Sequence, residues 1–461
     1  MSEIAGLPFW ELTFDADGDP DAAGRDAFLA ELPGSGVTDL IVFSHGWNND
    51  RGIALRLYDR FFGTLAGQLG SARTDRPVRV GLAGVLWPSQ RWSDEPIPDF
   101  AAPAGPGAGG AASVTDAAGG EVEQPAELDP KTLADLKDIF PTAAEPLDRM
   151  AELLAGPSTS DALTEFHQQL AAFAKQAGET GDDGEDDRDR PGLTAAEPGM
   201  LMDPPEELFE RYADTLQQSG VTFESADGGE AGIGNFVRGI LHGAKEALRQ
   251  ATYWQMKNRA GTVGRTGLGP LIGRLHEVAP DVRVHLVGHS FGARLVSYAL
   301  AGLPAGLNPS PVRSVTLLEG AFSQWVFASK LPFDAGRHGA LAGILDRVDG
   351  PMAVCYSSHD GAVGTFYPLA SMAARDDSAG IGDAESRWGG IGANGAQGAG
   401  AHTEAINGAG PGVTYPLADH QPLNIDSSDI VRAGGPPSGA HSDIIHPELT
   451  WIVLLAGRIV Q

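Results

Sequence analysis

Residues 282–301 read VRVHLVGHSFGARLVSYALA, and this stretch decides which fold we expect. Its first six residues are the apolar run of a buried strand, and its last nine have the composition and spacing of a helix. Between them the pentapeptide GHSFG matches the pattern G-x-S-x-G, which needs glycine on both sides because larger side chains would collide with the neighbouring strand and helix. The stretch therefore predicts a sharp, strained turn that presents the hydroxyl of Ser290.

Strand and helix signals alternate on both sides of this turn. Upstream, residues 37–44 and 78–87 are apolar runs bounded by glycine or proline, and residues 53–69 between them have apolar side chains at helical spacing. Downstream, three more strand candidates lie at residues 312–318, 352–356 and 423–430. A terminal helix is expected at residues 447–456. Strands joined by helical crossovers predict an α/β fold with a mainly parallel, doubly wound sheet.

The chain divides into three parts. Residues 1–90 and 229–461 carry the α/β pattern, whereas residues 91–228 contain helical patterns between a low-complexity stretch at 101–120 and a charged one at 181–191. We interpret the middle part as a largely helical, cap-like insertion between two halves of one α/β core. A surface insertion without a role at the site is the alternative.

The composition of the chain limits the classes of partner, the cross-links and the cellular location that we expect. The formal net charge is −29, from 61 acidic and 32 basic residues, so neither nucleic acid nor an anionic membrane surface is expected as a partner. Cys355 is the single cysteine, which excludes an intramolecular disulfide. The N-terminus lacks a secretory signal and no apolar stretch is long enough to span a membrane, so we expect a cytoplasmic protein without membrane insertion.

A serine hydroxyl needs a base to act as a nucleophile, and the base needs an orienting carboxylate. When the nucleophile lies on a strand–turn–helix, the chain order is Ser, then Asp or Glu, then His. Asp360 follows the strand at 352–356, at the end where open α/β sheets place catalytic groups. Glu319, at the end of the preceding strand, is the alternative acid.

Four histidines follow Asp360 in the chain, at positions 402, 420, 441 and 446. His402 lies in a glycine-rich region and His420 precedes the last strand candidate. His441 lies in a loop between that strand and the terminal helix, and we expect it to be the base. His446 stands directly before Pro447, where a role at the helix start is the ordinary explanation, and it is the alternative base.

Acyl transfer also needs hydrogen-bond donors for the oxyanion that develops in the transition state. The backbone N–H of Phe291, next to the nucleophile, is one expected donor. The second is expected from the backbone N–H of Trp47, in the loop SHGWNN at residues 44–49. Gly46 would let that backbone approach the substrate, and His45, Gly46 and His289 are expected to line the site.

Three short motifs carry a family resemblance: HGWNN at residues 45–49, WPS at 87–89 and GHSFG at 288–292. Together they resemble bacterial serine esterases of the α/β-hydrolase fold, over about residues 37–90 and 249–461. The resemblance implies that fold and a triad of Ser290, Asp360 and His441. The chain lacks the HGGG oxyanion loop of the better-known lipases, which argues against long-chain lipid substrates.

The expected activity is hydrolysis of a carboxylic ester, or a related small acyl compound, through an acyl-enzyme. A thioesterase, an amidase or peptidase, and an acyltransferase would use the same triad. A non-catalytic interaction protein that retains the fold is an alternative of another class. No cofactor is expected: residues 15–19 do not match a calcium loop, and the glycine-rich residues 388–400 are expected to form a mobile loop rather than a phosphate site.

Overall fold

The computed structural model describes residues 2–70, 74, 76–89, 92, 122–123, 126–177, 198–223, 231–371 and 387–461. In this described part, nine strands form one sheet: β1 (Ser2–Ile4), β2 (Leu7–Thr13), β3 (Asp39–Ser44), β4 (Val80–Leu86), β7 (Arg283–His289), β8 (Val312–Leu318), β9 (Met352–Tyr356), β10 (His402–Ala405) and β11 (Pro422–Asp426). Their order is β1-β2-β4-β3-β7-β8-β9-β11-β10. All neighbours pair in parallel except β1 with β2. The predicted α/β class with a mainly parallel sheet is confirmed.

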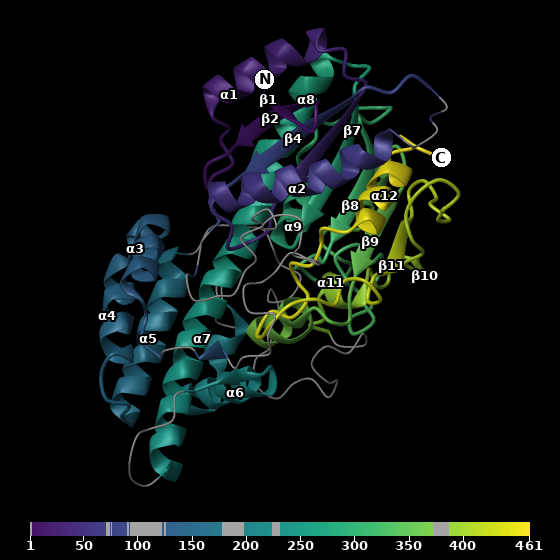
Figure 1. Ribbon diagram of the computed structural model, residues 1–461. Helices are drawn as coiled ribbons and strands as arrows, with labels where there is room; N and C mark the ends of the chain where they lie inside the picture. The colour runs from purple at the N-terminus through teal and green to yellow at the C-terminus, as the bar shows by residue number, and fades with distance from the viewer. Residues whose placement is uncertain are drawn as a thin grey trace, which may run out of the picture.

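Helices cover both faces of the sheet (Figure 1). Helices α2 (Arg51–Leu69) and α12 (Pro447–Ala456) pack together on one face, and α1 (Ala22–Glu31), α8 (Gly269–Val278) and α9 (Phe291–Gly302) lie on the other. Side chains of β3 alternate between the two layers: Ile41 and Phe43 join the core under α2, whereas Leu40 and Val42 join the core on the α9 side. Burial on both faces explains why β3 reads as a continuous apolar run.

Most predicted elements are present with small shifts at their ends. The strands at 312–318 and 352–356 and the helix at 447–456 have the predicted bounds. The strand predicted over 423–430 ends at Asp426, because the Asp426 carboxylate accepts hydrogen bonds from the backbone N–H and the hydroxyl of Ser428 and turns the chain there. The edge strand β10 was not predicted.

The middle of the chain is helical where it is described. Helices α4 (Ala144–Leu154), α5 (Ser160–Ala177) and α6 (Pro205–Gln218) contact α7 (Ala231–Thr262), and α3 (Pro130–Ile139) packs against α4. Figure 1 shows this group beside the sheet rather than on its faces. Two short strands, β5 (Val122–Glu123) and β6 (Val221–Thr222), pair in parallel. The C-terminal part of α7 packs against α9, where Arg294 Nε donates to Lys257 O (2.8 Å), so α7 joins the helical group to the core.

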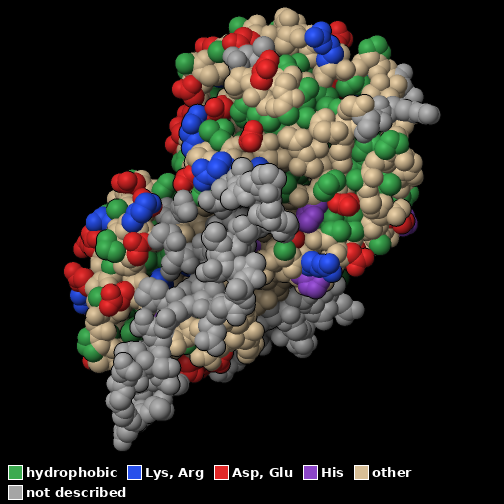
Figure 2. All heavy atoms as spheres, viewed as in Figure 1, with side chains coloured by type: hydrophobic (Ala, Val, Ile, Leu, Met, Phe, Trp, Pro, Cys, Tyr) green, Lys and Arg blue, Asp and Glu red, His purple; other side chains and the backbone are tan. Residues whose placement is uncertain are grey.

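Short helical segments complete the described chain: α10 (Tyr367–Ser371), α11 (Ile391–Asn394), π-helical turns at Val263–Leu268 and Ala362–Phe366, and 3-10 turns at Leu32–Gly34, Pro141–Ala143, Gly199–Met202 and Ile344–Arg347. Figure 2 shows acidic and basic side chains interspersed over the described surface of the face in view. No helix among the described residues is both long enough and apolar enough to cross a membrane.

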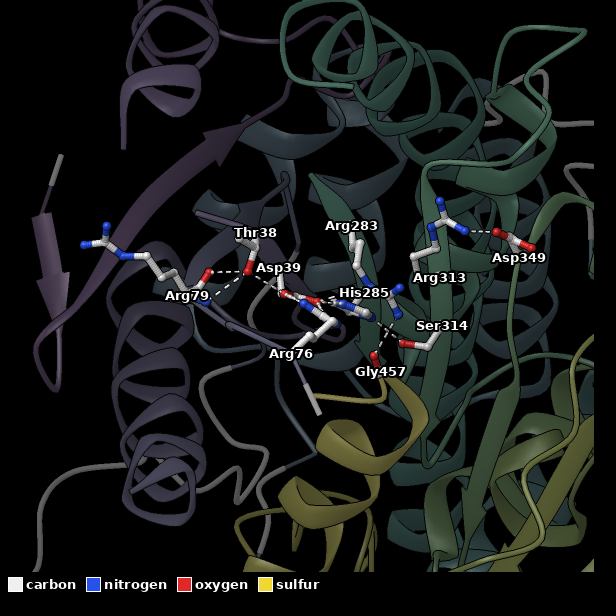
Figure 3. A network of polar contacts seen from close by, with 10 residues as sticks. All are labelled: Thr38, Asp39, Arg76, Arg79, Arg283, His285, Arg313, Ser314, Asp349 and Gly457. Carbon is white, nitrogen blue, oxygen red and sulfur yellow. Dashed lines mark hydrogen bonds and ion pairs between the residues drawn. The ribbon is translucent and has the colours of Figure 1, made fainter. Parts of the chain in front are cut away.

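A network of buried and half-buried polar side chains lies at the amino ends of β3, β7 and β8 (Figure 3). The carboxylate of Asp39 accepts hydrogen bonds from Thr38 Oγ1 (2.7 Å), Arg76 Nη1 (2.7 Å) and His285 Nε2 (3.0 Å). His285 Nδ1 lies 2.9 Å from Ser314 Oγ. Burial alone would raise the pKa of Asp39, but the hydrogen bonds from His285 and Arg76 hold this pKa well below its usual range. The carboxylate of Asp39 is therefore a charged, hydrogen-bonded group in the core.

Asp39→Ala is expected to lower the free energy of unfolding by on the order of 3 kcal/mol at pH 7, because it leaves buried donors of the network without their acceptor. Since the pKa of Asp39 is lowered in the folded state from 3.8, its contribution is complete above that pH and is lost as the pH falls. Urea unfolding at about pH 7 and about pH 3 measures this contribution. Equal stability of the two proteins at neutral pH would contradict a stabilising role of the network.

Candidate active site

Ser290 lies at the turn between β7 and α9, in a backbone conformation that non-glycine residues rarely adopt, with φ 56° and ψ −123°. The turn is held by hydrogen bonds to the neighbouring segment: the Ser290 N–H donates to Leu318 O (3.0 Å), and the Ser290 carbonyl accepts from the N–H of Ala293 (3.0 Å) and Ala321 (3.2 Å). A strained residue persists only where its surroundings fix it, and such residues cluster at functional sites.

The two glycines of the GHSFG motif are required by close backbone contacts. A Cβ atom at Gly288 would lie 2.3 Å from Gly292 O, and one at Gly292 would lie 2.0 Å from Ser44 O. Any larger residue would push the start of α9 away from β7 and β3. The local structure around Ser290 is therefore the strand–turn–helix that the motif predicts.

The structure brings Ser290, His441 and Asp360 together. Ser290 Oγ lies 2.8 Å from His441 Nε2, and His441 Nδ1 lies 2.7 Å from Asp360 Oδ2. The other carboxylate oxygen of Asp360 accepts a hydrogen bond from the N–H of Val363 (2.9 Å). With its proton on Nδ1, a neutral His441 donates to Asp360 and accepts from the Ser290 hydroxyl, which is the arrangement that activates a serine as a nucleophile.

Backbone hydrogen bonds join the loop of Asp360 to the loop of His441. The Ala440 N–H donates to His359 O (2.9 Å), and the Gly361 N–H donates to Ser438 O (3.1 Å). Gly439 has φ +60°, and a Cβ atom there would lie 2.4 Å from His359 O. These contacts fix two loops that are about 80 residues apart in the chain, so the distance between acid and base is set by the backbone.

His289, which we expected only to line the site, holds the backbone of the His441 loop. Its Nε2 donates a hydrogen bond to the carbonyl of His441 (2.7 Å), and the two imidazole rings lie 5.0 Å apart. Burial lowers the pKa of His289 to about 3, so its ring stays neutral beside His441. A neutral ring that donates through Nε2 leaves the nearby base free to accept the proton of Ser290.

The other candidate histidines make different contacts. His402 lies on the edge strand β10, and His420 Nδ1 lies 3.2 Å from Leu345 O. His446 immediately precedes α12 and pairs with Asp443 (Nε2 to Oδ1 2.8 Å). Of the four, the structure pairs only His441 with Ser290 in the part of the chain it describes.

Glu319, the alternative acid, is also close to the site but does not contact the base. It directly follows β8 and is fully buried, and its carboxyl interacts with that of Asp360. The ring of His441 is hydrogen-bonded to Asp360. Burial, followed by the negative charge of Asp360, raises the pKa of Glu319 well above its usual value.

The expected oxyanion loop lies directly against the nucleophile. A Cβ atom at Gly46 would lie 2.6 Å from Ser290 Cβ, so only glycine fits there. The loop follows β3, and Ser290 follows the adjacent strand β7; the chain passes from β3 to β4 on one side and returns to β7 on the other. In open α/β sheets, ligands bind at the carboxyl ends of strands at such a change of direction.

Side chains from three motif positions hold the carbonyl of Gly46. It accepts hydrogen bonds from His45 Nδ1 (2.8 Å), Asn49 Nδ2 (3.2 Å) and Ser89 Oγ (3.2 Å). Because the N–H of a trans peptide points opposite to its carbonyl, the N–H of Trp47 is directed away from these donors. Asn49 and Ser89 therefore orient the loop, a role that we did not predict for them.

Two further residues brace this loop. Trp87 Nε1 donates to His45 O (3.0 Å), and its ring stacks on that of His45 with an interplanar angle of 10°. Asn48 has φ +64°, a conformation that asparagine tolerates better than most residues, and its side chain bonds the backbone of Trp92. The HGWNN and WPS segments thus form one hydrogen-bonded unit beside Ser290.

Comparison of the chain with protein-family models, with curated proteins and with solved structures finds no match.

Two backbone N–H groups beside Ser290 are available to a ligand. The N–H of Phe291 is at the first position of α9, where a helix has no internal acceptor, and the N–H of Trp47 lies in the loop after β3. Within the described residues neither group has a hydrogen-bond acceptor. Both expected donors are thus free to bind an oxygen atom.

Helix α7 places an aromatic side chain between these two residues. The ring of Tyr253 lies 4.4 Å from that of Phe291 and 5.3 Å from that of Trp47, with the latter pair edge-to-face. Tyr253 and Phe291 are buried, and Trp47 is half-buried. The helical group therefore contributes, through α7, an aromatic ring beside both residues whose N–H groups are the expected oxyanion donors.

The glycine-rich segment at 388–400 differs from our expectation. It is not a mobile loop: α11 is buried, the Gly392 N–H donates to Gly320 O (2.8 Å), and Gly392 O accepts from the Ser357 N–H (3.0 Å). A Cβ atom at Gly392 would lie 2.4 Å from the carbonyl carbon of Glu319. Its glycines allow a tight fit against the ends of β8 and β9.

Among the residues that the structure describes, no cluster of three or more His, Cys, Asp or Glu side chains could hold a metal ion.

Proposed function

We propose that the protein is a serine hydrolase of the α/β-hydrolase type that cleaves a carboxylic ester or a related acyl compound through an acyl-enzyme. The observation that carries this proposal is the contact of Ser290 Oγ with His441 Nε2 (2.8 Å) at a strained turn, with His441 oriented by Asp360. The motifs that resemble bacterial serine esterases lie at this site. The central position of β7 and the change of direction beside it also fit that fold.

The reaction follows from these positions. Ser290 Oγ attacks the carbonyl carbon of the substrate while His441 Nε2 takes the hydroxyl proton, and Asp360 stabilises the imidazolium. The carbonyl oxygen becomes negatively charged and accepts hydrogen bonds from the N–H groups of Trp47 and Phe291. The tetrahedral intermediate collapses, the C–O bond to the alcohol breaks, and His441 gives its proton to the leaving oxygen. Water then repeats these steps, releases the acid and regenerates Ser290.

The aromatic rings beside the expected oxyanion donors favour an uncharged acyl group. Trp47, Tyr253 and Phe291 place apolar rings near the nucleophile, where desolvating a charged group would be costly. We therefore place carboxylic esters first. Thioesters, amides and acyl transfer to another acceptor use the same attack by Ser290, and they differ only in the group that leaves or in the group that replaces water.

Labelling with a fluorophosphonate probe tests the proposal, because the probe reacts with a serine only when a neighbouring base activates it. We expect the natural protein to be labelled and Ser290→Ala to remain unlabelled. Ser297→Ala is the matched control, since Ser297 lies on α9 with its hydroxyl bonded to Ala293 O (2.8 Å). Absence of labelling on folded natural protein would favour a non-catalytic interaction protein instead.

Gly46→Ala is expected to lower the labelling rate at least about 100-fold while the protein stays folded, because the added methyl group would overlap Ser290 Cβ and displace the oxyanion loop. Gly63→Ala is the control: Gly63 lies on α2, and a Cβ atom there has no neighbour within 4 Å. We compare second-order rate constants for probe labelling, together with thermal unfolding. A Gly46→Ala protein that is labelled as fast as the control would contradict the position of this loop at the nucleophile.

A further inference from the structure

Glu319 is a buried carboxyl group beside the triad that the proposed mechanism does not use. It is fully buried and has φ +46°, a strained conformation for a glutamate. Its N–H donates to Cys355 O (3.1 Å), and a Cβ atom at Gly392 would lie 2.9 Å from its Cα. These contacts fix the backbone of Glu319, and the burial of its side chain keeps the carboxyl next to Asp360.

Hydrogen-bond donors are divided unequally between the two carboxyl groups. Asp360 accepts from the N–H of Val363 (2.9 Å) and from His441 Nδ1 (2.7 Å). Neither oxygen of Glu319 has a donor of normal geometry within the described residues, although the carboxyl is close enough to Asp360 to interact with it. Two ionised carboxylates are both acceptors and cannot bond each other, whereas one added proton creates a donor. Because Glu319 is the carboxyl without donors, the added proton is expected on Glu319.

The charges around Glu319 agree with this division. Burial and the charge of Asp360 both oppose ionisation of Glu319, and Asp443 adds a weaker negative charge. The peptide N–H of Ser357 favours the ionised form, but it donates to Gly392 O (3.0 Å). The remaining titratable neighbour, the thiol of Cys355, is itself buried, and burial followed by the proximity of Glu319 raises its pKa.

We propose that Glu319 carries a proton in the native protein and donates it in a hydrogen bond to Asp360, as a positioning residue for the triad. The catalytic consequence rests on the proposed hydrolase function. With this bond, Asp360 has a third donor besides Val363 and His441, so its carboxylate is restrained with Oδ2 towards the imidazole. The pair carries one negative charge, enough to stabilise one imidazolium.

The stability of Glu319→Gln as a function of pH tests the protonation directly. A group that is protonated when folded but ionised when unfolded, above its ordinary pKa of 4.5, makes the natural protein lose stability as the pH rises. Glutamine cannot ionise, so the Tm of Glu319→Gln relative to the natural protein is expected to increase from about pH 5 to about pH 8. Glu210→Gln, which alters an exposed glutamate on α6, is the control, and its Tm difference should stay constant over this range. A constant difference for Glu319→Gln as well would overturn the proposal.

The positioning role is tested by the Nδ1–H resonance of His441 in protein labelled with 15N-histidine. We expect this resonance to move upfield in Glu319→Ala, which removes the donor to Asp360, and to return towards its natural position in Glu319→Gln, whose amide restores one. The probe-labelling rate should fall about 10- to 100-fold in Glu319→Ala and largely recover in Glu319→Gln. Identical resonances in all three proteins would overturn the positioning role.

These measurements separate the two proposals. If the natural protein is not labelled by the probe but the pH dependence is as expected, the hydrolase function fails and the protonated Glu319 stands. If the protein is labelled and the pH dependence is flat, the hydrolase function stands and this inference fails. Should Glu319→Ala not fold, Glu319→Met, which fills a similar volume without a donor, takes its place in the resonance and labelling measurements, and the pH dependence of Glu319→Gln still decides the protonation.

Discussion

His441→Ala is expected to lower kcat for hydrolysis of p-nitrophenyl acetate by on the order of 10⁵- to 10⁶-fold, because removing one member of a Ser–His–Asp triad abolishes the action of the whole triad. His441 Nε2 is the group placed 2.8 Å from Ser290 Oγ, and without it the hydroxyl keeps its proton. Thermal unfolding should change little, since the side chain of His441 lies at the rim of the core with 12 % of its surface exposed. Steady-state kinetics and circular dichroism on the same preparation measure both effects.

His446→Ala is the matched control for this prediction. His446 pairs with Asp443 and precedes α12, so its loss should affect stability and leave kcat close to that of the natural protein. The reverse result, with full activity in His441→Ala and none in His446→Ala, would show that the base is assigned to the wrong loop.

Asp360→Asn is expected to lower kcat about 10⁴-fold with little change in fold, because an amide in this position favours the wrong tautomer of the base. Asp360 Oδ2 accepts a hydrogen bond from His441 Nδ1 (2.7 Å), and this bond keeps Nε2 unprotonated and facing Ser290. An Asn side chain can place its NH₂ group there instead, so the ring would turn its proton towards Ser290. Kinetics at several pH values measure the effect.

The matched comparison is Asp443→Asn, which alters a nearby carboxylate that bonds His446 and two backbone N–H groups. We expect its activity to stay far above that of Asp360→Asn. If Asp360→Asn retained full activity while Glu319→Gln lost it, Glu319 would be the acid of the triad.

The local parts of the site were predictable because short-range sequence determines them. The turn at Ser290 needs an apolar strand, two glycines and a helix, and all of these lie within twenty residues. Gly46 was expected only to let the backbone approach the substrate, and its contact with Ser290 on the neighbouring strand's turn was not predictable from its own segment. The mainly parallel sheet followed from alternating strand and helix signals, since parallel strands require helical crossovers.

Relations between distant segments were not predictable in this way. The sequence left Asp360 and Glu319 as alternatives because both follow neighbouring strands; the choice depends on which carboxyl the loop of His441 reaches. The hydrogen bond of Ser89 to Gly46 and the stacking of Trp87 on His45 join segments more than 40 positions apart. A pattern within one segment carries no signal for such contacts.

The mobile loop that we expected at 388–400 is a second case in which the sequence of one segment did not predict its contacts. Its glycines indicated flexibility, because glycine has no side chain to restrain the backbone. In the folded chain they allow the segment to pack against the ends of β8 and β9, and Gly392 has no room for a methyl group beside Glu319. Composition alone cannot tell these two uses of glycine apart.

The most direct test of the account is to trap the acyl-enzyme. The protein is mixed with excess p-nitrophenyl acetate, quenched in acid within the first turnovers, digested and analysed by mass spectrometry, while released p-nitrophenol is followed by absorbance. We expect a burst of p-nitrophenol and an acetyl group on the peptide that contains Ser290, with neither present in Ser290→Ala. Turnover without a burst or adduct, or an acetyl group on another residue whose replacement abolishes turnover, would contradict Ser290 as the nucleophile.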